Sequence, residues 1–152
     1  MNEDFTDLLT ALLEAEARFL VVGAHAMAIH GIPRATGDLD LWIQADQENA
    51  SRVWRALQRF GAPLESLGVR RPDLHSAGIV IQIGVPPRRI DLMTQASGLT
   101  FDEAWKNKVL HPIGALSVPF LGRTELIRNK RATGRPKDLA DLAALEEPPI
   151  EP

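Results

Sequence analysis

The residues best suited to chemistry in this chain are Asp38 and Asp40, which belong to the run Asp-Leu-Asp-Leu-Trp-Ile at positions 38–43. The alternation of polar and apolar residues predicts a strand with both carboxylates on one face and the leucines on the other. Two residues along a strand span about 6.6 Å, so the two carboxylates could close around one cation.

A phosphate-binding turn is predicted shortly before this acidic pair. The apolar run at 19–22 indicates a buried strand, Gly23 ends it, and residues 24–30 have helical composition. A strand that passes through a glycine into a helix leaves backbone N–H groups free for phosphate. Mg²⁺ binds one or two carboxylates together with phosphate oxygens. A phosphate-binding turn beside an acidic pair is therefore typical of phosphoryl or nucleotidyl transfer.

The arrangement Arg34-x-Thr36-x-Asp38-x-Asp40 after a glycine turn resembles nucleotidyltransferases of the DNA polymerase beta superfamily. The most similar branches are the small bacterial AbiEii and MenT toxin-type and MNT-type nucleotidyltransferases. The resemblance covers about residues 21–145. Beyond the first motif it rests on a third carboxylate, a basic segment and a closing motif, namely Asp91 within 89–93, Lys130 within 126–130, and Arg-Pro-Lys-Asp at 135–138.

This resemblance implies an α+β nucleotidyltransferase fold, a small mixed β-sheet flanked by helices. It also implies that Mg²⁺ or Mn²⁺ is held by three catalytic carboxylates, Asp38, Asp40 and Asp91. The nucleotide-binding residues that it implies are Gly23, Ala24, Arg34, Thr36 and Lys130. The chain departs from the family pattern at the turn, where Gly23-Ala24 stands in place of Gly-Gly or Gly-Ser. Ala24 keeps the backbone N–H but offers no hydroxyl to a phosphate.

Several of these residues also have simpler structural interpretations. Arg34 could neutralise the acidic pair at the surface instead of binding phosphate. His25 could donate to a nucleotide, although a histidine in a helix more often has a satisfied ring nitrogen, and the same holds for His30. Lys137 and Asp138 could form an ion pair that fixes the last helix.

Length and composition set limits on the class of protein. The chain has 152 residues, 45% of them apolar, which predicts one domain over residues 1–145 and a disordered acidic, proline-containing tail over 146–152. It has no cysteine, which excludes disulfides and thiolate metal sites. It shows no secretory signal and no membrane-spanning run, so we expect a cytoplasmic protein with no membrane partner.

Charge is distributed unevenly along the chain. The net charge is −3, but the segment 123–137 has six basic residues and one acidic residue. The segment is therefore +5 and the rest of the chain −8. Such a segment can form a positive face on an acidic protein, or it can simply be a solvated helix surface.

The predicted elements follow from periodicity and from helix-ending residues. We expect helices at about 3–17, 24–30, 44–60, 99–107, 124–132 and 137–145, and strands at 19–22, 38–43, 78–84, 89–93 and 115–120. Residues 61–77 are predicted to form a loop with at most a short helical turn. If the strand at 89–93 lies beside the one at 38–43, the three carboxylates meet on one face.

Three functions remain open at this point. The first is transfer of an NMP from an NTP to a hydroxyl of an RNA or protein, as a toxin-type enzyme does. The second is modification of a small molecule, as in antibiotic nucleotidyltransferases. The third is a non-catalytic, antitoxin-like module that keeps the fold and binds a partner. The chain is short, so a partner chain or a second copy could complete the site.

Overall fold

A six-stranded mixed β-sheet forms the centre of the computed structural model, which describes residues 1–32 and 37–146. The strands are β1 (Phe19–Val22), β2 (Leu39–Ile43), β3 (Val80–Ile83), β4 (Ile90–Met93), β5 (Val109–Ile113) and β6 (Leu116–Phe120). Their order across the sheet is β3-β4-β2-β1-β6-β5. β2 pairs in parallel with β4, and β1 in parallel with β6, whereas the other neighbours are antiparallel.

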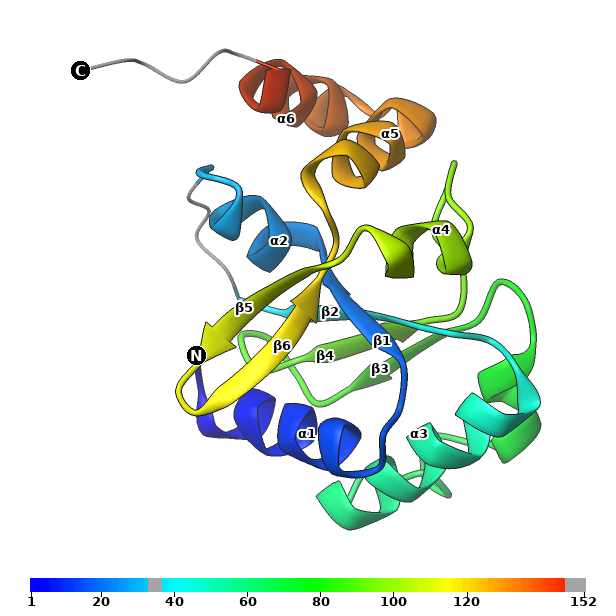
Figure 1. Cartoon of the computed structure of the whole chain (residues 1–152). Coiled ribbons are helices and arrows are strands. Elements are labelled where there is room, and N and C mark those ends of the chain that lie inside the picture. The colour runs from blue at the N-terminus through cyan, green and yellow to red at the C-terminus, as the bar shows by residue number, and fades with distance from the viewer. Residues whose placement is uncertain (33–36, 147–152) are drawn as a thin grey trace.

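Helices cover both faces of this sheet (Figure 1). They are α1 (Glu3–Glu14), α2 (Gly23–Ile29), α3 (Gln47–Phe60), α4 (Phe101–Lys106), α5 (Arg123–Thr133) and α6 (Pro136–Glu146), with a 3₁₀ turn, η1, at Arg71–His75. α1 and α3 pack against each other on one side of the sheet, and α2, α5 and α6 lie on the other side (Figure 1).

Alternation along β2 divides the core from the site. Leu39, Leu41 and Ile43 are fully buried. They face the side covered by α1, whose leucine stripe is also buried and whose first turn is capped by the Asn2 side chain through the N–H of Phe5 at 3.0 Å. Asp40 therefore points to the opposite face, the one that α5 and α6 approach.

The element boundaries differ from the predicted ones in three informative places. α1 ends at Glu14, because Glu16 has a φ of +56°, which no helix continues through. α5 begins at Arg123 after an N-cap at Gly122, so Thr124, which the sequence suggests as the N-cap of this helix, lies inside it. β5 was not predicted. It is an edge strand that contains Pro112, and a proline is tolerated at an edge because no neighbour needs its missing N–H.

Two of the predictions concern residues outside the described ranges. Arg34 and Thr36 fall within 33–36, and most of the predicted tail falls within 147–152, so both predictions lie outside the described residues. Among the residues that are described, no helix combines the length and the apolar character that a bilayer crossing requires.

Candidate active site

Two carboxylates meet at the centre of the sheet. Asp40 of β2 and Asp91 of β4 are Cα partners in the parallel pair, and the carboxyl group of Asp91 acts directly on that of Asp40. Burial, followed by the charge and hydrogen bond of Asp91 and the charge of Asp38, raises the pKa of Asp40 to about 6. The pair can therefore hold a proton at mildly acidic pH, and a cation placed there would relieve the repulsion between the two groups.

The guanidinium of Arg89 joins the other carboxylates of this group. Its Nε and Nη2 donate to Asp91 Oδ1 and Oδ2 at 2.9 and 3.2 Å, and Nη2 also lies 3.1 Å from Asp38 Oδ2. The hydrogen bond to Asp91 is the main reason that the pKa of Arg89 is raised. The second oxygen of Asp38, Oδ1, is buried and has no hydrogen-bond partner among the residues that the structure describes.

Gly23 brings the turn between β1 and α2 directly against this acidic group. Its φ is +67°, in the left-handed region that favours glycine, and a Cβ built on it would lie 2.2 Å from Asp40 Oδ2. Its neighbour Val22 is the Cα partner of Asp40 across β1 and β2. Only a residue without a side chain allows the turn and the carboxylate to approach this closely.

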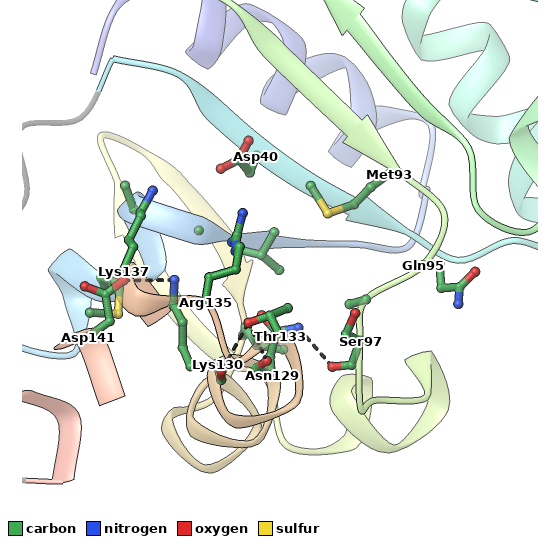
Figure 2. Close-up of a pocket in the computed structure, with 16 residues that line it drawn as sticks. Asp40, Met93, Gln95, Ser97, Asn129, Lys130, Thr133, Arg135, Lys137 and Asp141 are labelled. Carbon is green, nitrogen blue, oxygen red and sulfur yellow. Dashed lines mark hydrogen bonds and ion pairs between the residues drawn. The ribbon is translucent and has the colours of Figure 1, made fainter. Parts of the chain in front are cut away.

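A cavity of about 460 Å³ opens in front of Asp40. One wall comes from β1, α2, β2 and the segment after β4, and the other from α5 and α6 (Figure 2). Its polar lining consists of Asp40, Gln95, Ser97, Asn129, Lys130, Thr133, Arg135, Lys137 and Asp141. The cavity thus places an acidic group on the sheet opposite three cations, which lie on α5, on α6 and in the turn between them.

The three cations in this cavity differ in how fully they are paired with acidic residues. Lys130, whose side chain is only 10% exposed, lies 3.5 Å from Asp138 Oδ1 and 3.1 Å from Asp141 Oδ2. Burial lowers the pKa of its amine, and Asp138 opposes that shift. Arg135 donates from Nε to Asp138 Oδ2 at 2.6 Å and from Nη2 to Oδ1 at 3.2 Å. These bonds hold the pKa of Asp138 well below its usual range.

Lys137 differs from both, because it has no ion pair with any other described residue. Figure 2 shows its amine pointing into the cavity toward Asp40, whereas Lys130 points toward Asp141. The predicted ion pair between Lys137 and Asp138 is therefore not formed. Asp138 instead binds Lys130 and Arg135, and this arrangement ties the start of α6 to α5.

The donor chemistry of the acidic group fits a divalent cation. Carboxylate oxygens are the ligands that Mg²⁺ prefers, and the buried, unpartnered Oδ1 of Asp38 is one such oxygen. Within residues 1–32 and 37–146, however, no three carboxylate or imidazole groups are arranged as they stand to hold a metal ion. Arg89 neutralises Asp38 and Asp91 instead, so it must move before all three carboxylates can share a metal.

His25 of α2 and His30, the C-cap of that helix, both pack within the fold. His30 donates from Nε2 to the carbonyl of Leu121 at 2.8 Å. His25 packs edge-on against Phe5, but its buried Nε2 has no hydrogen-bond partner among the described residues. Burial, followed by the positive N-terminus, lowers the pKa of His25, an effect that the backbone of Asp38 opposes, so the ring favours its neutral form. His30 is thus satisfied, as the structural interpretation expects, whereas Nε2 of His25 is not.

The structure brings together most of the predicted site residues that it describes. Gly23, Ala24, Asp40 and Lys130 line one cavity, and Asp91 lies beside Asp40. Sequence reasoning missed the roles of Arg89 and Arg135 and the position of Lys137. Arg89 could have been found, because it alternates with Asp91 along the chain and so shares its face.

Comparisons with known proteins support the fold. No protein-family model matches the chain, and no curated protein sequence matches it. Among solved structures, a candidate nucleotidyltransferase from Thermotoga maritima superimposes with a TM-score of 0.63 at 15% sequence identity, over 92% of this chain and 88% of the other. A likeness at this identity concerns the fold alone. The chain therefore has the nucleotidyltransferase fold that its motifs predicted, a mixed six-stranded sheet flanked by helices.

Proposed function

We propose that this protein is a metal-dependent nucleotidyltransferase, which moves an NMP from an NTP to a hydroxyl acceptor. The observation that carries the proposal is the cavity in which Asp40, the strand partner of Asp91, faces Lys137 and Arg135. A triphosphate with a bound cation has the complementary charges, because its metal faces carboxylates while its phosphates face cations.

Asp38, Asp40 and Asp91 would hold the Mg²⁺ or Mn²⁺ ion. That ion would neutralise the triphosphate and favour deprotonation of the acceptor hydroxyl. Because β2 and β4 are adjacent strands in the middle of the sheet, the backbone fixes the positions of Asp40 and Asp91. Such preorganisation lets the carboxylates act without a costly rearrangement of the chain.

The phosphate groups would lie between the turn and the basic wall. Gly23 and Ala24 line the cavity beside Asp40, where the absence of a Cβ at Gly23 leaves room for close approach. On the opposite wall, Lys137 is the cation that we expect to contact the leaving pyrophosphate, because no acidic residue within 1–32 and 37–146 pairs with it. Lys130, predicted to bind the nucleotide, lines the same cavity. It would add positive charge near the phosphates while it stays paired with Asp138 and Asp141.

The acceptor is less constrained than the nucleotide. Three arginines of the basic segment have acidic partners. Arg128 Nη1 lies 3.0 Å from Glu103 Oε1, Arg131 pairs with Glu146, and Arg135 pairs with Asp138. The segment is thus less positive than its sequence suggests, which weakens the case for an RNA acceptor. A protein or small-molecule hydroxyl is equally compatible with this surface, and a partner chain or second copy could supply the rest of the acceptor site.

The test is to incubate the purified protein with each α-labelled NTP, Mg²⁺ and a cell extract, and to identify the molecule that gains label. The proposal expects labelling that Asp40→Asn abolishes and that Asp7→Asn leaves intact. Asp7 is an exposed residue of α1, so its substitution removes the same charge far from the cavity. Absence of label with all four NTPs in proteins, RNA and small molecules alike would contradict the proposal.

A further inference from the structure

Arg89 makes contacts that nucleotide transfer itself does not require. It directly precedes β4, and its guanidinium binds both oxygens of Asp91 and one oxygen of Asp38 at distances of 2.9 to 3.2 Å. The fork geometry of a guanidinium suits such a bidentate contact with a carboxylate. Arg89 thus joins two carboxylates that come from different segments of the chain.

The oxygens that Arg89 occupies are the ones a metal ion would need. Three carboxylates gather here against one guanidinium, and Asp40 has no ion pair of its own among the described residues. If Asp38 and Asp91 ligate a divalent cation, their oxygens must turn from Arg89 to the metal. A cation and a guanidinium cannot share such a small site, because their charges repel each other.

Arg89 can leave without disturbing the sheet. Its carbonyl accepts a hydrogen bond from Leu39 N at 3.0 Å, which fixes its backbone beside β2. Its side chain is nevertheless 29% exposed, and the preceding residues 84–88 form an exposed turn. A long side chain at such a position can rotate into water while the strand stays in place.

We propose that Arg89 is a built-in counter-ion of the acidic site, which holds Asp38 and Asp91 together without metal and is displaced when a divalent cation binds. This inference rests on the proposed function, because it takes the three carboxylates to be the metal ligands. Arg89 would stabilise the apoprotein and lower the affinity of the site for its first metal ion. The site would then fill chiefly when metal arrives with the extra contacts of a nucleotide.

The experiment measures Mn²⁺ binding without nucleotide, by calorimetry and by the loss of the free Mn²⁺ electron paramagnetic resonance signal. Arg89→Gln should bind Mn²⁺ about tenfold or more tightly than the parent, since one competing positive charge is gone. Arg88→Gln is the matched control. It removes the same charge from the neighbouring residue, which contacts Asp4 at 3.4 Å instead of the acidic group. Its Mn²⁺ affinity should equal that of the parent.

Thermal unfolding supplies a second readout that does not depend on activity. Without metal, Arg89→Gln should melt at a lower temperature than the parent, because the carboxylates then repel one another without compensation. Added Mn²⁺ should raise its Tm by more than it raises that of the parent. If Arg89→Gln does not fold, Arg89→Lys keeps a charge but loses the fork, and it should still bind Mn²⁺ more tightly than the parent.

The alternatives give distinct results. Equal Mn²⁺ affinities in the parent and the Arg89 variants would overturn the counter-ion role while leaving the metal site standing. Weaker binding in the variants would also overturn it, and would mean that Arg89 organises the ligands instead of competing for them. If neither protein binds Mn²⁺, even with an NTP present, both this inference and the proposed function fail.

Discussion

Asp40 and Asp91 are Cα partners across two parallel strands at the centre of the sheet, so their carboxylates meet without any flexible segment between them. Such proximity is unfavourable for an apoprotein, because two carboxylates repel each other when both are ionised. The fold tolerates the cost with a raised pKa at Asp40 and a guanidinium at Asp91. Such a site gains more from a bound divalent cation than an isolated carboxylate would.

Asp40→Asn should stabilise the apoprotein at neutral pH. The pKa of Asp40 is raised from 3.8 to about 6 in the folded protein, so the folded state binds more protons than the unfolded state between these values. Stability therefore falls as the pH rises from about 4 to about 6. The variant lacks that fall and should be more stable at pH 7.5 by on the order of 1 kcal/mol, allowing for partial solvent exposure.

Urea unfolding without metal at pH 4, 5, 6 and 7.5 measures this effect. The difference between Asp40→Asn and the parent should grow across the series and level off above pH 7. Asp7→Asn should show no such growth. A variant that is less stable than the parent at pH 7.5 would mean that the ionised carboxylate is stabilised by its surroundings.

Gly23→Ala should disrupt the site beyond the general cost of a left-handed residue. Gly23 and Gly68 have nearly the same φ, +67° and +69°, but a Cβ at Gly68 would meet nothing within 4 Å. Both alanine variants should lose roughly 1 kcal/mol from backbone strain. Gly23→Ala should lose more, because its Cβ collides with the Asp40 carboxylate, and it should also bind an NTP with Mg²⁺ more weakly. Equal losses of stability and equal nucleotide affinities would show that the close approach has no consequence.

Lys130 and Lys137 should differ in what their removal does. Lys130→Ala removes the amine that the buried Asp138 and Asp141 share, and the free energy of unfolding should fall by about 1–3 kcal/mol, since Asp138 keeps its bonds to Arg135. Lys137→Ala removes an exposed cation and should change stability by less than about 0.5 kcal/mol while weakening NTP binding about tenfold. Lys106→Ala, an exposed lysine outside the cavity, is the control for Lys137.

Calorimetry with a non-hydrolysable NTP and with the corresponding nucleoside separates the two effects. Lys137→Ala should lose affinity for the NTP but not for the nucleoside. If Lys137→Ala binds the NTP as the parent does, the contact with the pyrophosphate belongs to another cation, and Lys130 or Arg135 becomes the better choice.

The sequence predicted the fold and the meeting of Asp40 with Asp91 on one face of the sheet, because both depend on short-range patterns. Alternation along residues 38–43 and 89–93 fixes which face the carboxylates take, and the glycine at the end of β1 marks the turn beside them. The likeness to a solved structure of the same fold agrees with that prediction.

The other features of the fold and the site depend on contacts between residues far apart in the chain, which a sequence does not show. Nothing local shows that Lys130 is paired across α5 and α6 while Lys137 points into the cavity. The edge strand β5 lacks clean alternation and contains Pro112, so its pairing with β6 becomes evident only in the sheet. Asp38, which pairs with Arg89, also lies 51 positions away from it in the chain, so sequence periodicity cannot indicate this contact.

Titration of a non-hydrolysable NTP into the parent and into Asp91→Asn, each with and without Mg²⁺, tests the central claim most directly. The account predicts that Mg²⁺ tightens binding to the parent by at least about tenfold and leaves the affinity of Asp91→Asn almost unchanged. Equal affinity of the parent with and without Mg²⁺, or an equal gain from Mg²⁺ in Asp91→Asn, would contradict a metal-dependent nucleotide site at these carboxylates.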